Sequence, residues 1–310
     1  MTENEFYEKL KEAVQEKMGD IPVELLKSVK NNNITHTSIL IGQKDREVTP
    51  SIHLESMYQH YKNGWGMEQA AGFVIQAWQA YQNQKPDLPI SEFLDWQEAK
   101  EKIYFRLFSA RCNPHYVREG ICRDFLDMVL VAYYHAGDTD SGIMGIRITK
   151  ELAEKQWHIS GEEICRMAEI NTPRLFPYRI DRLDSLLLAY LEKNFGPDAV
   201  PKDIREVLEQ NPMYILQNKQ GINGATVMAY EGLLPQLYEK LGRGFYVIPS
   251  SIHEVLLLPE TKGVNEEMVR KIIFQTNRKH VKPEERLSDS LYYYNGKELS
   301  IAGKEGGADE

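Results

Sequence analysis

The chain has 310 residues, of which 42% are hydrophobic and 27% charged, a composition that is ordinary for a globular protein with a buried core. Its formal net charge of -9 repels nucleic acid and anionic membrane surfaces, so we expect neither as a partner. The length is compatible with two domains.

The three cysteines are Cys112, Cys122 and Cys165, which lie far apart and show no Cys-x-x-Cys spacing. This pattern favours a reducing compartment over a disulfide framework or a structural zinc site. The acidic first residues lack the apolar segment of a signal peptide, and no apolar run approaches the roughly 20 residues that span a bilayer. We therefore expect a cytoplasmic protein that does not enter the membrane.

In the N-terminal third, apolar residues at helical spacing predict helices around residues 6–14 and 67–81. Alternating residues predict paired strands over 34–41 and 47–53, followed by a helix over 55–61. Residues 84–89 contain two prolines and form the first predicted linker.

In the middle of the chain, a helix is predicted over 96–110 and a second linker over 112–119. Strands follow at 125–135 and 143–148. Ser160 with Glu163 forms a capping box for the next helix, which residues 171–177 are expected to stop. Two more helices are predicted, over 183–191 and 201–210.

The C-terminal third carries the densest apolar runs. Strands over 213–217, 225–230, 245–248 and 252–258 are predicted to form one mostly antiparallel sheet, covered by a helix over 264–279. A helix over 232–241 and a closing hairpin at Asn295-Gly296 complete the prediction. The fold class is therefore α+β, built from antiparallel strand-strand-helix units with helices packed on the sheets. We expect two lobes, 1–112 and 113–302, and a disordered tail, 303–310.

The turn Ser250-Ser251-Ile252-His253-Glu254 is the first candidate site. Together with Asn218 and Asn223 it could form a hydrolase-type or metal-assisted active site. However, the His-Glu pair lacks a second histidine one helical turn later, where Leu257 stands. Adjacent side chains on a strand also point to opposite faces, so we predict that His253 and Glu254 do not form a catalytic or metal-binding pair.

His53 and Glu55 would share one face of an extended strand, and His60 follows. A surface histidine at such a corner is far commoner than a metal ligand, and nothing fixes a fourth ligand, so we expect no metal site. The sequence contains no G-x-x-x-x-G-K-[ST] motif and no G-x-G-x-x-G opening a helix. We therefore expect no cofactor.

Tyr292, Tyr293 and Tyr294 lie on the predicted closing hairpin. Either they pack across strands, or an exposed tyrosine forms a recognition surface. A terminal hairpin tends to lie at a sheet edge, where another strand can pair. With no assembled catalytic set in view, we expect a non-enzymatic binding or regulatory protein that recognises a protein or peptide partner through this hairpin.

Four segments together resemble a known family: 171–177 (Asn-Thr-Pro-Arg-Leu-Phe-Pro), Asn218-Lys219, 249–255, and Leu287-Ser-Asp-Ser with the tyrosines after it. The chain is similar to domain-of-unknown-function family 5688, uncharacterised bacterial proteins common in anaerobic gut Firmicutes. The resemblance covers most of the chain. It implies a cytoplasmic bacterial protein whose lobes fold together, and it transfers no catalytic residues.

Overall fold

The computed structural model describes residues 1–42, 51–83, 90–139, 142–196, 201, 205, 212–261 and 263–303. The chain divides into two compact units, Met1–Asp87 and Leu88–Glu310. The sequence placed the boundary at 112 instead, inside the region that pairs as a sheet in the second unit. The first predicted linker, the tip of the 137–142 turn, most of the helix predicted over 201–210 and residues 304–310 of the tail lie outside the described residues.

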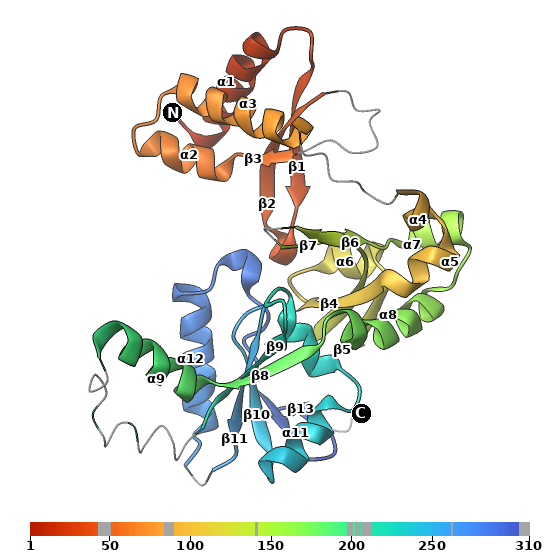
Figure 1. Ribbon diagram of the computed structural model, residues 1–310, viewed down its shortest axis with the longest axis vertical. Helices are drawn as coiled ribbons and strands as arrows, with labels where there is room; N and C mark the ends of the chain where they lie inside the picture. The colour runs from red at the N-terminus through yellow and green to blue at the C-terminus, as the bar shows by residue number, and fades with distance from the viewer. Residues whose placement is uncertain are drawn as a thin grey trace. The chain divides into compact units, whose positions relative to one another are not determined.

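In the residues that the structure describes, the first unit has a three-stranded antiparallel sheet and three α-helices (Figure 1). Its elements are α1 (Glu3–Met18), β1 (Val23–Val29), β2 (Thr35–Ile41), β3 (Ser51–His53), α2 (Glu55–Lys62) and α3 (Met67–Asn83). Helix α1 begins with a capping box, in which the Thr2 hydroxyl accepts a hydrogen bond from Glu5 N. The predicted helices of this unit are confirmed.

The core of the first unit joins the helices to one face of the sheet. Phe6, Leu10 and Val14 recur at helical spacing on α1 and are fully buried. They share a cluster with Ile39 and Ile41, which strand alternation places on the same face of β2. The intervening residues of β2 therefore face the opposite side of the sheet.

The second unit contains a four-stranded and a six-stranded sheet, both antiparallel. The first consists of β4 (Ile103–Ser109), β5 (Cys122–Phe125), β6 (Met128–Thr139) and β7 (Gly142–Arg147). The second has the strand order β13 (Leu299–Ile301), β12 (Tyr292–Tyr294), β10 (Phe245–Pro249), β11 (Val255–Pro259), β9 (Tyr214–Asn218) and β8 (Tyr178–Arg182). The α+β class is thus confirmed.

The helices of the second unit include three long ones and several short ones. They are α4 (Ile90–Leu94), α5 (Trp96–Ala99), α6 (Pro114–Glu119), α7 (Lys150–Leu152), α8 (Gly161–Leu175), α9 (Leu183–Phe195), α11 (Leu233–Leu241) and α12 (Glu266–Lys279). Ser160 caps α8, since its hydroxyl accepts from Glu163 N, but the Glu163 carboxylate pairs with Arg166, so only the Ser160 half of the predicted capping box is seen. Ile273 of α12 packs with Tyr246 and Leu291, so α12 covers one face of the six-stranded sheet as predicted.

Several local predictions were wrong. The linker predicted over 112–119 contains helix α6, residues 125–135 span the end of β5, a turn and part of β6, and the strand predicted over 252–258 begins only at Val255. Residues 96–110 form a short helix and then β4, because a strand buried on both faces shows a continuous apolar run that resembles a helix. Residues 225–230 were predicted as a strand but fall largely within the 3-10 helix η4 (Gly224–Ala229), which begins after Asn223 turns the chain with a φ of 52°. Helix α8 continues through Pro173 to Leu175, so residues 171–177 do not stop it where expected.

Two buried threonines connect the two sheets of the second unit. On β4, Phe105 N donates to Thr172 Oγ1 of α8 at 2.9 Å, and Leu107 N donates to Thr226 Oγ1 of η4 at 3.1 Å. Residues 105 and 107 point their N–H groups to the same edge of the strand, away from the neighbouring β6. The hydroxyls therefore satisfy edge groups that would otherwise be buried without a partner.

We expect Leu257→Ala to lower the free energy of unfolding by about 2–5 kcal/mol, because Leu257 is fully buried in the main core of the second unit. Leu256, on the other face of β11, is partly exposed, and Leu256→Ala should cost less. Chemical denaturation of both variants measures the difference. Equal losses in the two variants would contradict the assignment of the strand's faces.

Candidate functional site

The predicted turn at residues 250–254 joins β10 to β11 and is held by its own side chains. Ser250 Oγ donates to Glu254 Oε1 at 3.1 Å. Ser251 is buried, and its Oγ accepts from His253 N at 3.0 Å. Both serine hydroxyls therefore stabilise the turn, and neither contacts a histidine ring nitrogen as the nucleophile of a hydrolase would.

The neighbouring loop brings Asn218 and Asn223 to this turn. Asn218 closes the loop with two hydrogen bonds to Ile222, donating from Nδ2 to the carbonyl at 2.8 Å and accepting from the amide at 3.3 Å. Asn223 N donates to His253 Nδ1 at 3.3 Å. Gly224 is required here, because a Cβ would lie 2.3 Å from His253 O. The hydrogen bond from the Asn223 backbone to the His253 side chain therefore connects the two turns.

The two asparagines line a small cavity beside the 250–254 turn. Asn218 and Asn223 line a cavity of ≈ 10 Å³ together with Tyr104 and Phe176. That volume suits about one water molecule. Ser250, Ser251 and His253 are not among the residues that line this cavity.

The three tyrosines of β12 alternate as predicted. Tyr292 and Tyr294 are buried in the main core, whereas Tyr293 is partly exposed on the opposite face. The Tyr293 hydroxyl donates to Glu260 Oε2 at 2.6 Å, and the carboxylate beside it, together with partial burial, raises its pKa to about 12. The hairpin lies at an edge of the sheet, where β13 is the last strand. Tyr292 and Tyr294 are therefore core residues of the second unit.

Asp127, which the sequence did not single out, explains the Leu-Ser-Asp-Ser motif. Its carboxylate accepts from Tyr292 Oη at 2.5 Å and from Ser288 Oγ and Ser290 Oγ at 2.9 Å each. Burial and the negative charge of Asp127 raise the pKa of Tyr292, so its phenol stays protonated and donates. The motif therefore ties the C-terminal segment to the turn between β5 and β6.

The histidines of the first unit are divided between two places. His60 stacks on Trp65 with ring centroids 4.5 Å apart. His53 and Glu55 lie together, although β3 ends at His53 and Glu55 begins α2, so they do not share the extended strand that was predicted; their neighbour is His36. Burial, followed by the positive charges of Lys30 and His36, lowers the pKa of His53. His36 could have been found only from the register between β2 and β3.

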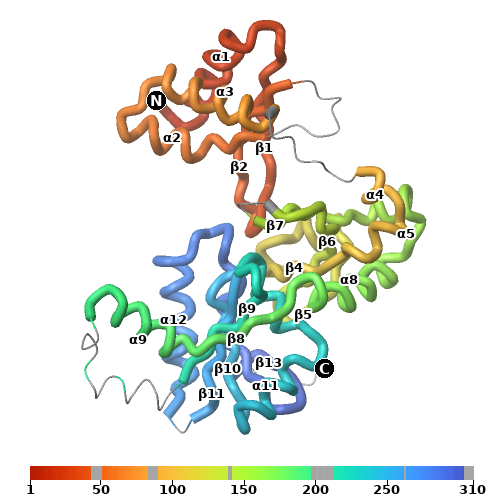
Figure 2. The backbone as a smooth tube through the Cα atoms, in the orientation of Figure 1, coloured from red at the N-terminus to blue at the C-terminus, as the bar shows by residue number. Residues whose placement is uncertain are grey.

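An exposed apolar surface follows the edge strand β8. On α9, Leu186 and Leu187 are each 43% exposed, Tyr190 is 61% exposed and Phe195 is 71% exposed. Figure 2 shows α9 continuing from β8 and running away from the strands of the sheet. Only Asp184 and Leu188 of this helix are buried. We call Leu186, Leu187, Tyr190 and Phe195 the α9 surface.

Three antiparallel sheets with helices packed against them define this chain as an α+β protein of two units. The chain belongs to the family of unknown function DUF5688, whose family model matches residues 3–296, so the predicted membership is confirmed. The match runs through both units. No curated protein and no solved structure matches the chain. Among the described residues, no helix is both long enough and apolar enough to span a bilayer.

We expect Asp127→Ala to lower the free energy of unfolding by about 1–3 kcal/mol, because it leaves the buried Tyr292 hydroxyl without an acceptor. Asp124→Ala is the matched control: Asp124 is exposed and only three residues away, and its removal should change stability by less than about 0.5 kcal/mol. Urea denaturation measures both. A loss in Asp127→Ala no greater than in the control would mean that the carboxylate does not hold the C-terminal segment.

Proposed function

We propose that this protein is a non-enzymatic binding or regulatory protein of the bacterial cytoplasm, and that it recognises a protein or peptide partner through the α9 surface and the adjoining strand β8. The observation that carries the proposal is the run of large apolar side chains that α9 exposes next to a sheet edge. We place the contact on α9 rather than on the tyrosine hairpin, where Tyr292 and Tyr294 are buried and only Tyr293 is partly exposed, because α9 exposes more large apolar side chains.

The composition of α9 supports a contact surface. A helix that faces only water usually carries polar residues on its outer side. Here Leu186 and Tyr190 are one helical turn apart, and Leu187 lies beside them, so their exposed areas are contiguous on the helix. Contiguous apolar surface rimmed by polar residues commonly marks a protein interaction site.

The position of β8 indicates what kind of partner fits. It is the last strand of the six-stranded sheet, and an edge strand can pair with an added strand. Tyr178 on this strand is 39% exposed. Arg179 and Asp181 pair with each other at 2.5 Å and provide a charged border. These features favour an extended segment that pairs along β8 and lays apolar side chains on α9.

The state of the cysteines supports a reducing compartment. Cys112, Cys122 and Cys165 are all free thiols. Burial raises the pKa of Cys122 to about 11, and burial also raises that of Cys165, so both remain protonated at neutral pH. Free thiols persist where glutathione and thioredoxin keep them reduced, as in the cytoplasm.

The proposal can be tested with a photo-crosslinking amino acid placed at position 190 in living cells. The matched control places it at Leu94, which is 41% exposed on α4 of the same unit. We expect a discrete crosslinked protein from position 190 that is absent from position 94. The captured protein is then purified and titrated against the unmodified chain by calorimetry.

In that titration, Leu187→Ala with Tyr190→Ala should weaken binding by about 1–3 kcal/mol, as loss of interface aromatics usually does. Leu94→Ala should leave the affinity unchanged, and circular dichroism confirms that each variant is folded. Unchanged affinity in the double variant would rule out the α9 surface as the site of contact.

A further inference from the structure

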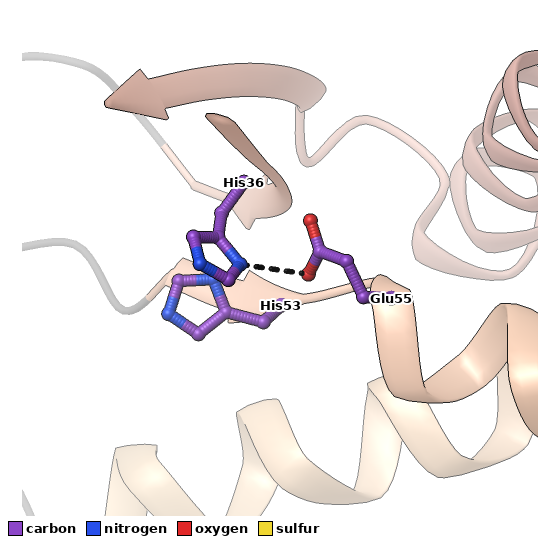
Figure 3. A group of neighbouring side chains, drawn as sticks. All are labelled: His36, His53 and Glu55. Atoms are coloured by element: carbon purple, nitrogen blue, oxygen red, sulfur yellow. Dashed lines mark ion pairs between the residues drawn. The ribbon is translucent and has the colours of Figure 1, made fainter. Parts of the chain in front are cut away.

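Three potential metal ligands meet at one end of the first unit's sheet (Figure 3). His36 lies near the start of β2, His53 ends β3, and Glu55 begins α2. In the register of β2 and β3, Ser38 lies opposite His53. Leu54 N then donates to Thr37 O, so the chain stays beside β2 as it turns into α2, and Glu55 lies near His36. Strand alternation then puts His36 and His53 on the same face, opposite to the face that Ile39 contributes to the core.

Neighbouring groups hold two of these side chains in place. Glu55 Oε1 accepts from Thr37 N at 2.7 Å, which fixes the carboxylate and directs its second oxygen toward His36. The Ser38 hydroxyl lies 2.9 Å from His53 Nδ1 and orients that ring. Orientation of ligands by outer hydrogen bonds is typical of metal sites, whose ligands must be positioned before the ion arrives.

Two of the ligand atoms are buried and make no hydrogen bond. His36 Nδ1 and Glu55 Oε2 lie 3.4 Å apart, close enough to form an ion pair when the histidine is protonated, and among the described residues neither has a hydrogen-bond partner. One ligand atom from each of His36, His53 and Glu55 lies within 4.8 Å of the others. Buried polar atoms without a hydrogen bond are rare, and an ion between them is one physical explanation.

The distance between His36 and Glu55 suits a small tetrahedral ion. Zinc bonds at about 2.0–2.1 Å to nitrogen and 2.0–2.2 Å to oxygen place two tetrahedral ligand atoms about 3.3–3.5 Å apart. The observed 3.4 Å between His36 Nδ1 and Glu55 Oε2 falls in that range. We propose that His36, His53 and Glu55 form a binding site for one divalent transition-metal ion of the Zn²⁺ type.

The ligand set determines which ions can bind. Two imidazoles and one carboxylate suit Zn²⁺, Co²⁺ and similar ions, whereas Mg²⁺ and Ca²⁺ require mainly oxygen ligands. Three protein ligands leave one tetrahedral position for water or for a group from another molecule. The site lies in the first unit and the α9 surface in the second, so the two proposals stand on separate residues and fail separately.

The test uses the full chain after treatment with a chelator, titrated with ZnCl₂ by calorimetry. We expect one Zn²⁺ per chain, a thermal melting temperature that rises with added Zn²⁺, and visible absorption bands of tetrahedral Co²⁺ when Co²⁺ replaces it. An excess of Mg²⁺ should not displace the ion. Absence of stoichiometric binding, or displacement by Mg²⁺, would overturn the proposal.

Substitution of each proposed ligand tests where the ion binds. His36→Gln, His53→Gln and Glu55→Gln should each weaken Zn²⁺ binding more than about tenfold, because a first ligand matters at least as much as its supporting residues. Glu55→Gln keeps an oxygen that can accept from Thr37 N, so the fold is preserved. His60→Gln is the matched control in the same unit and should bind as the unmodified chain does. Equal weakening in the control, or none in the three ligand variants, would place the ion elsewhere.

Discussion

The packing of the second unit depends on hydrogen bonds to the outward backbone N–H groups of one buried strand, β4. β4 is the end strand of its sheet, yet helix α8 and η4 cover it, so its outward N–H groups cannot reach water. The hydroxyls of Thr172 and Thr226 accept from Phe105 and Leu107 and remove that cost. Because α8 leads into β8 and η4 follows β9, the same two contacts attach the six-stranded sheet to the four-stranded one.

A second set of contacts joins the chain end to the same sheet. Asp127 accepts from the hydroxyls of Ser288, Ser290 and Tyr292, and so fixes the segment that leads into β12. The segments through which the chain resembles its family take part in hydrogen bonds within the fold: Thr172, Asn218, His253 and Ser288 each make at least one. These four side chains therefore stabilise local structure and the contacts between elements.

Function is then expected where side chains are not engaged in holding the fold together. The α9 surface exposes apolar area that the second unit does not bury. In the first unit, His36 Nδ1 and Glu55 Oε2 are buried ligand atoms without hydrogen bonds. The partner and the ion that we propose would address different features: exposed apolar surface in one unit and buried polar atoms without hydrogen bonds in the other.

The sequence by itself determined the features that depend on neighbours a few residues away. The cap at Ser160 and the opposite faces of Tyr292 and Tyr293 follow from cap chemistry and the strand period. The tertiary structure decided β4, η4 and the place of His36. Thr172 and Thr226 reach β4 across 67 and 119 residues of chain, and His36 reaches Glu55 only through the register of two strands. Local periodicity cannot specify such pairings, because they are selected by the packing of the whole core.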